Sequence, residues 1–190
     1  MEQQKSTEEH VCIQPNLKTT IKWLGNITEV VVDSVEEALA DINRTVTVGL
    51  TGHFALAFGL SYNAGIAIDA RGNVALQATG NVGGGLPAAT PIALYTTVTN
   101  APSYEELVGP GYQVGGSGGV KFVSVGGEAI IIPPAPGSGD ESYYGGSINL
   151  GISLLPYYAE LHGEVGKTVS TRAINIFDLI RSGLKGLEGW

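Results

Sequence analysis

The amino-acid sequence predicts a mainly β protein: an antiparallel up-and-down barrel, or a barrel-like sheet or sandwich, between an N-terminal amphipathic helix and a short C-terminal helix. Three observations carry this prediction. Apolar and small residues alternate from Thr45 to Asp69, short apolar runs separated by turn residues continue to Ser170, and the sequence has no strand-helix-strand repeat. Alternation is typical of strands, because successive side chains point to opposite faces of a sheet.

The chain is expected to consist of a flexible lead, residues 1–16, and a single domain, residues 17–190. At 190 residues the chain is long enough to bury a core. Apolar residues recur at helical spacing over residues 17–43, which predicts an amphipathic helix. We expect this helix to cover a sheet face or to close one end of a barrel; docking to a partner is the alternative.

In the first long run, residues 45–69, the even-numbered positions are mostly apolar and the odd-numbered positions before Asp69 are mostly small and without formal charge. These two sets of positions are called the apolar parity and the small parity below. Packing of the apolar parity in a core is the favoured interpretation. A transmembrane barrel, with an apolar outside and a small or polar lumen, has the same alternation and is the alternative. The apolar parity consists of Val46, Val48, Leu50, Phe54, Leu56, Phe58, Leu60, Tyr62, Ile66 and Ile68.

Parity also predicts the length of the connections. Apolar residues remain on even positions on both sides of Asp69–Asn73, which requires a hairpin connection with an odd number of residues. A single strand over residues 45–69 would be about 75 Å long at ~3.3 Å per residue, so we expect a second odd turn near Ser61–Gly65. The antiparallel β region extends over residues 45–170, and a short helix is expected over residues 173–187.

Composition excludes several classes of function. The net charge is −8 and the isoelectric point about 4.8, which argue against nucleic-acid binding. Cys12 is the only cysteine, so an internal disulfide and a cysteine-based zinc site are excluded. The sequence contains neither a signal-peptide pattern nor a long apolar run for a membrane helix. Export is therefore expected only as part of a larger bacterial protein or by a leaderless route.

Few residues are candidates for chemistry. Glu160, His162 and Glu164 alternate along one predicted strand and share a face, where they could bind a metal or share a proton. The favoured interpretation is a solvated strand face, so neither a metal nor a cofactor is expected. His53 lies on the small parity, as a hydrogen-bonded structural residue or as a functional group in a barrel lumen.

Four segments resemble the C-terminal regions of bacterial RHS-repeat proteins: Ile66–Ala78, Val98–Ser103, Tyr143–Ser147 and Ile174–Ile180. The similarity extends over roughly residues 49–183, and its motifs describe turns and strands, so no catalytic residue is carried over. The resemblance implies a variable effector or toxin tip that is delivered by a larger RHS shell and is frequently paired with an immunity protein.

The function expected from the sequence is therefore that of a non-enzymatic effector that acts on a membrane or on a protein partner. A soluble barrel that binds an apolar ligand is one alternative, with a calyx lined by Phe54, Leu56, Phe58, Ile66 and Ile68. Phe54, Phe58, Tyr62 and His53 are the candidate binding residues. An enzyme that uses Glu160, His162 and Glu164 is the other alternative.

Overall fold

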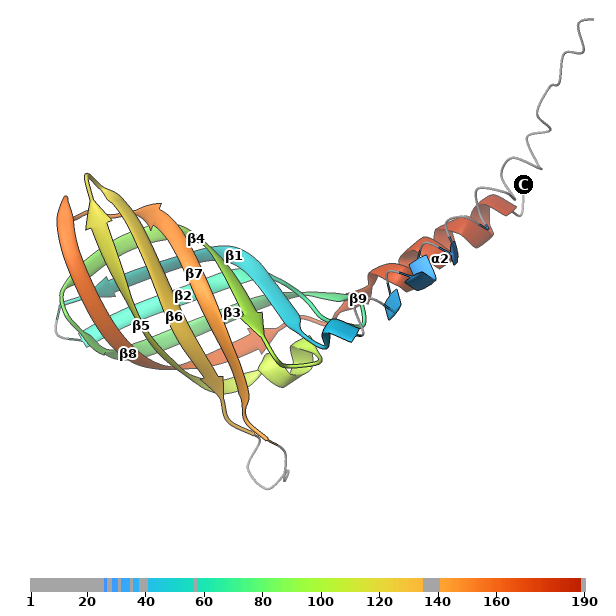
Figure 1. Ribbon diagram of the computed structural model, residues 1–190, viewed down its shortest axis with the longest axis horizontal. Coiled ribbons are helices and arrows are strands. Elements are labelled where there is room, and N and C mark those ends of the chain that lie inside the picture. Colours follow the sequence, from blue (N-terminus) through green and yellow to red (C-terminus); the bar gives the residue numbers. More distant parts are fainter. Residues whose placement is uncertain are drawn as a thin grey trace, which may run out of the picture.

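A computed structural model shows a closed antiparallel barrel of eight strands, with a helix that projects from one end (Figure 1). The structure describes residues 26, 29–30, 32–34, 36–37, 41–56, 58–134 and 141–188, so the expected lead over residues 1–16 lies outside the described residues. The strands are β1 (Thr45–Ala55), β2 (Phe58–Ile68), β3 (Asn73–Gly85), β4 (Ala88–Thr99), β5 (Gly109–Val120), β6 (Val123–Ile132), β7 (Tyr143–Ile152) and β8 (Tyr157–Ser170).

The antiparallel barrel-like sheet is confirmed, and its strand order shows two Greek keys rather than a simple meander. The sheet runs β2-β1-β4-β7-β6-β5-β8-β3, and an additional pairing of β2 with β3 closes it. Strands β1–β3 are joined by hairpins and β4 returns to lie beside β1; strands β5–β7 repeat this pattern and β8 returns beside β5.

The two ends of the barrel differ. At one end, here called the short-loop end, the connections consist only of residues 56–57, 86–87, 121–122 and 153–156. The opposite end, here called the helical end, carries the 3-10 helix η1 (Tyr104–Leu107), the short strand β9 (Ile174–Asn175) and helix α2 (Ile176–Glu188) (Figure 1). Tyr104 of η1 packs on the small residues Ala67 and Ala75, and thereby covers part of this end of the barrel.

Helical residues are also present where the N-terminal helix was expected. The described residues between 26 and 42 are helical, and Arg181 of α2 contacts Asp33 and Glu36 at 2.7 and 2.6 Å. The expected C-terminal helix is confirmed, although it begins at Ile176, after the two residues of β9.

The odd-length connection predicted from parity is confirmed between β2 and β3, where Ile68 pairs with Val74 and five residues lie between them. Gly72 adopts a positive φ of 74° there, which glycine accepts without steric cost. The first run also divides into two strands through an odd connection, because Ala55 pairs with Gly59, but the position expected for this turn, near Ser61–Gly65, was wrong. That segment is part of β2, and the chain turns between Ala55 and Phe58 at a place with no glycine, asparagine or proline.

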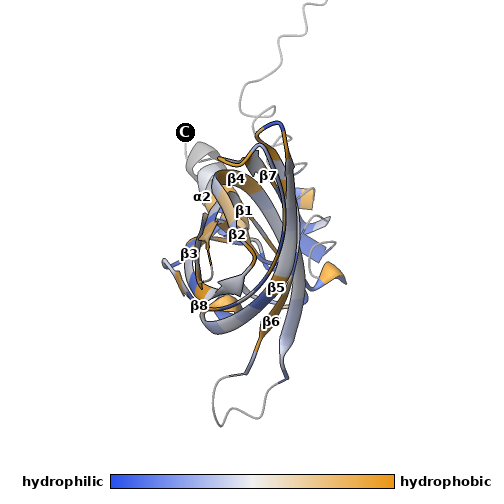
Figure 2. Ribbon diagram, turned by 90° about the vertical axis from the view of Figure 1, so that its left-hand side faces the viewer, coloured by the Kyte–Doolittle hydropathy of each residue, from blue (hydrophilic) through white to orange (hydrophobic). Residues whose placement is uncertain are grey.

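The apolar parity faces outward, so the favoured interpretation of the alternation, as an apolar core, was wrong. Figure 2 views the closed ring of eight strands from the short-loop end. Phe58 is 89% exposed and Ile148 71% exposed, whereas the buried hydrophobic residues of the strands are mainly alanines. The lumen is filled instead by hydroxyl, amide, imidazole and carboxylate side chains. An eight-stranded barrel has an interior just wide enough for side chains, which favours small or hydrogen-bonded residues on the inner face.

Candidate functional site

Five ionisable side chains meet inside the barrel: His53 of β1, Glu128 of β6, and Glu160, His162 and Glu164 of β8. These five residues are called the lumen cluster below. Glu160, His162 and Glu164 are only 3%, 8% and 4% exposed, so their interpretation as a solvated strand face was wrong. Strands β1 and β8 are not neighbours in the sheet, so these side chains meet across the lumen.

One carboxylate oxygen lies at the centre of the lumen cluster. Oε1 of Glu160 is 2.7 Å from Nδ1 of His53 and 2.5 Å from Nδ1 of His162. The two imidazole rings contact each other edge to face, with centroids 4.8 Å apart. Both rings therefore present the same nitrogen to the same oxygen.

The second nitrogen of each imidazole faces another carboxylate. Nε2 of His53 lies 3.4 Å from Oε1 of Glu164, and Nε2 of His162 lies 3.7 Å from Oε1 of Glu128. Both distances are longer than a good hydrogen bond. Nε2 of His53 and Oε1 of Glu164 are buried and have no hydrogen-bond partner among the described residues.

A serine hydroxyl holds the remaining oxygen of each glutamate. Ser117 donates to Oε2 of Glu160 at 2.8 Å, Ser61 donates to Oε2 of Glu164 at 2.5 Å, and Ser147 donates to Oε2 of Glu128 at 3.1 Å. These serines lie on β5, β2 and β7. Each Oε1 is therefore directed at an imidazole by a bond from a different strand.

This network shifts two pKa values in opposite directions. Burial by itself would raise the pKa of Glu160, but hydrogen bonds from His162, His53 and Ser117 lower it to about 2. Burial by itself would lower the pKa of His162, but the carboxylates of Glu128 and Glu160 raise it to about 10. In the metal-free protein at neutral pH, Glu160 is therefore ionised and His162 is protonated.

We expect the metal-free barrel to be most stable between about pH 4.5 and 6.5. The lowered pKa of Glu160 contributes stability above pH 4.5 that is lost as the pH falls towards 2. The raised pKa of His162 contributes stability below pH 6.5 that is lost as the pH rises towards 10. Unfolding by urea in EDTA at a series of pH values measures this. A free energy of unfolding that does not change from pH 6.5 to 10 would contradict the assignment of His162.

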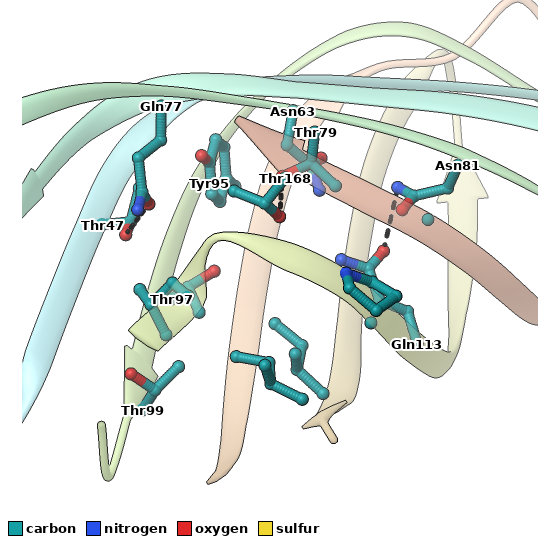
Figure 3. A pocket seen from close by; sticks show the side chains of 16 residues that line it. Thr47, Asn63, Gln77, Thr79, Asn81, Tyr95, Thr97, Thr99, Gln113 and Thr168 are labelled. Carbon is teal, nitrogen blue, oxygen red and sulfur yellow. Dashed lines mark hydrogen bonds between the residues drawn. The ribbon is translucent and has the colours of Figure 1, made fainter. Parts of the chain in front are cut away.

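A polar cavity of about 60 Å³ occupies the half of the lumen nearer the helical end (Figure 3). Asn81 joins the cavity to the lumen cluster, because its amide donates to Ser61 at 2.8 Å and to Gln113 at 3.2 Å. The volume has room for several water molecules. Most of the lining groups are hydroxyls and amides, among them Thr47, Asn63, Gln77, Thr79, Tyr95, Thr97, Thr99 and Thr168.

The arrangement offers one set of metal ligands. Ligand atoms of His53, Glu160 and His162 all lie within 4.8 Å of one another. Two imidazoles with one carboxylate form a ligand set used by zinc. Without a metal, the same groups form a buried network of ion pairs.

The candidate residues from the sequence separate into two groups. His53, Glu160, His162 and Glu164 come together in the lumen. Phe54, Phe58 and Tyr62 lie on the outer face and are 56%, 89% and 47% exposed, so they do not line a calyx. Leu56, Ile66 and Ile68 are also on the outside.

Glu128 was missed by the sequence reasoning. It follows Ser124 and Gly126 on the lumen-facing parity of β6, and it is the only charged residue of that strand. A single carboxylate at alternate positions that are otherwise small was the signal in the sequence that could have identified Glu128.

In the described part of the chain, no helix combines the length and the apolar character needed to cross a membrane. Comparisons of the whole chain with protein-family models, with curated proteins and with solved structures find no match.

Proposed function

We propose that this protein acts at a lipid bilayer, as a β-barrel whose apolar outer face contacts the hydrocarbon of the membrane. The observation that carries this proposal is that the outer face of the sheet is apolar and the inner face polar, the reverse of a barrel with an apolar core. Large apolar side chains are exposed on every one of the eight strands, while the lumen is polar. In water such an outer surface far exceeds the apolar patches of a few hundred Å² that monomeric soluble proteins expose.

The distribution of charge along the strands supports a bilayer as the surrounding medium. The eight strands contain four residues with a formal charge, and three of them, Glu128, Glu160 and Glu164, face the lumen. Lys167 is the exception, and it lies on β8 three residues before the strand ends at the helical end. A long lysine side chain near the end of a strand can extend to the membrane-water interface.

The dimensions of the barrel also match a bilayer. An 11-residue strand such as β2 is about 36 Å long, which at a tilt of ~45° covers about 25 Å along the membrane normal. Outer-membrane barrels have an apolar band of about this height between belts of aromatic residues. Here Phe54, Phe58 and Tyr157 lie towards the short-loop end, and Tyr112 and Tyr144 lie towards the helical end.

The short-loop end is the end that enters the membrane first in this proposal. Its connections include Leu56, Leu86, Phe122 and Leu154, all more than half exposed, and Lys121 is their only charged residue. The helical end carries Arg71, Glu105, Glu106, Glu141 and the charged residues of α2. Moving these charges across the hydrocarbon would be costly, so the helical end remains in water.

The resemblance to RHS C-terminal regions fits a role of this kind. An effector that is delivered by a larger protein requires a target, and a bilayer is the target that matches the outer face. A larger RHS shell or an immunity protein would then cover the apolar strands until they reach lipid. This role as a delivered effector is part of the proposal.

Depth-dependent fluorescence quenching tests the proposal. In a C12S background, L94C places a fluorescent label on the outer face of β4, where Leu94 is 64% exposed, and E105C places it on η1 at the helical end. With vesicles that contain nitroxide-labelled lipids, we expect strong quenching and a blue shift at position 94 only. Release of a trapped dye from the same vesicles reports whether insertion opens the membrane.

Equal spectra at the two positions, without quenching by the lipid nitroxide, would refute the bilayer proposal. A barrel of unchanged secondary structure that stays in solution as a defined oligomer would instead favour a protein partner as the cover of the outer face. An apolar ligand extracted from the purified protein would favour the soluble binding module.

A further inference from the structure

We propose that the lumen cluster binds one divalent transition-metal ion of the zinc class, through Nδ1 of His53, Nδ1 of His162 and Oε1 of Glu160. This inference does not rest on the membrane proposal, because the ligands lie inside the barrel whatever surrounds it.

The ligand atoms are close to the positions that an ion requires. They lie within 4.8 Å of one another, and two ligands of a tetrahedral ion with bonds of ~2.0–2.1 Å are about 3.3 Å apart. The two distances from Oε1 of Glu160 to the imidazoles are 2.7 and 2.5 Å and have to lengthen by less than an ångström, whereas the widest separation, at most 4.8 Å, has to shorten by up to ~1.5 Å. Rotation of the glutamate and imidazole side chains supplies shifts of this size.

Glu164 and Glu128 face the ring nitrogens that would not bind the ion. Histidines that bind metals almost always donate their other ring N–H to a carboxylate, a carbonyl or a water molecule. Nε2 of His53 faces Glu164 at 3.4 Å, and Nε2 of His162 faces Glu128 at 3.7 Å. When Nδ1 of each ring binds the ion, Nε2 keeps the ring proton, and the Nε2–H group donates a hydrogen bond to the carboxylate that faces it. This explains the buried Oε1 of Glu164, which otherwise has no hydrogen-bond partner among the described residues.

The serine bonds keep the ligands in place before the ion arrives. Ser117 holds Oε2 of Glu160 at 2.8 Å and leaves Oε1 directed at the two imidazoles. Ser61 and Ser147 do the same for Glu164 and Glu128. A preformed site loses little conformational entropy on binding, which favours affinity.

The charge of the cluster favours a cation. Three carboxylates surround the two imidazoles, so a divalent ion that replaces the proton of His162 meets an excess of negative charge. The cavity reaches Asn81 and Gln113, and the amide of Asn81 donates to Ser61, the hydroxyl that in turn donates to Glu164. Imidazole and carboxylate together suit zinc better than calcium or magnesium, which prefer oxygen ligands.

Zinc titration of the complete chain, stripped with EDTA and kept in detergent micelles, tests the inference. We expect one zinc ion per chain by mass spectrometry of the metal after gel filtration. H53Q and H162Q are expected to weaken binding by 100-fold or more, and E164Q by about 10–100-fold as a residue that orients a ligand. H10Q is the matched control, because it removes the only other histidine of the sequence and none of the proposed ligands.

A measurement on the unaltered protein covers the case in which a variant does not fold. Nitrogen NMR of the histidine side chains is expected to show Nδ1 of two rings shifting on addition of zinc, while Nε2 of both stays protonated. The inference is overturned if the wild-type chain binds no stoichiometric zinc at 10-fold excess over ~10 μM protein. It is also overturned if H10Q abolishes binding while H53Q and H162Q retain it.

Discussion

An arginine in the middle of the outer face, at I148R, is expected to weaken membrane insertion by about 2–4 kcal/mol, which is roughly 30- to 1,000-fold in the insertion equilibrium. Ile148 lies in the middle of β7 and is 71% exposed, so the outer face has room for the longer side chain. The cost arises because a guanidinium at the centre of the bilayer loses its hydration. Reversible unfolding by urea in lipid vesicles measures the change.

Y144R is the matched control for I148R. Tyr144 lies on the same face of the same strand and is 57% exposed, but it is four residues closer to the helical end. At a tilt of ~45° that distance is about 9 Å along the membrane normal, near the interface, where an arginine costs only about 0–1 kcal/mol. In water both substitutions should change stability by less than about 0.5 kcal/mol. Equal effects of the two in vesicles would therefore show that the outer face does not contact hydrocarbon.

Removal of the central carboxylate, in E160L, is expected to lower the free energy of unfolding by about 3–5 kcal/mol. Glu160 receives hydrogen bonds from Ser117 and His162 and lies 2.7 Å from Nδ1 of His53. A leucine leaves the protonated His162 buried without the carboxylate closest to it, and this uncompensated charge is the main cost. Urea unfolding in EDTA measures the loss in the absence of any metal.

Two further variants separate the charge of Glu160 from its shape. E160Q retains an oxygen that can accept a hydrogen bond, so we expect a smaller loss than in E160L. E106Q removes an exposed carboxylate on η1, and its effect should be within about 0.5 kcal/mol. If E160L and E106Q changed the free energy of unfolding by similar small amounts, the lumen cluster would not contribute to the stability of the barrel.

Local features of this protein followed from local sequence signals. Alternation predicted the strands and the odd connection between Ile68 and Val74, because the period of a strand is a property of the backbone. The turn between Ala55 and Phe58 was missed because its residues resemble those of a strand. Pairing of Ala55 with Gly59 and with Ala88 determines where β1 ends, and these partners are set by the tertiary fold.

The candidate site was only half visible in the sequence. A spacing of two places Glu160, His162 and Glu164 on one face of a strand, but this spacing does not determine whether the face is exposed to solvent or buried. His53 and Glu128 join them from β1 and β6, which lie apart from β8 along the chain and meet it only across the lumen. No local pattern encodes such a meeting, because closure of the barrel creates it.

The alternation of residues 45–69 by itself determined that one face of the sheet is large and apolar and the other small and uncharged. It did not determine which face is outside, because a period of two is the same for a soluble core and for an inverted barrel. Closure of eight strands decided this. The narrow interior accepts small residues and the hydrogen-bonded lumen cluster, and the bulky residues, from Val48 to Ile68 and beyond, are left on the outside.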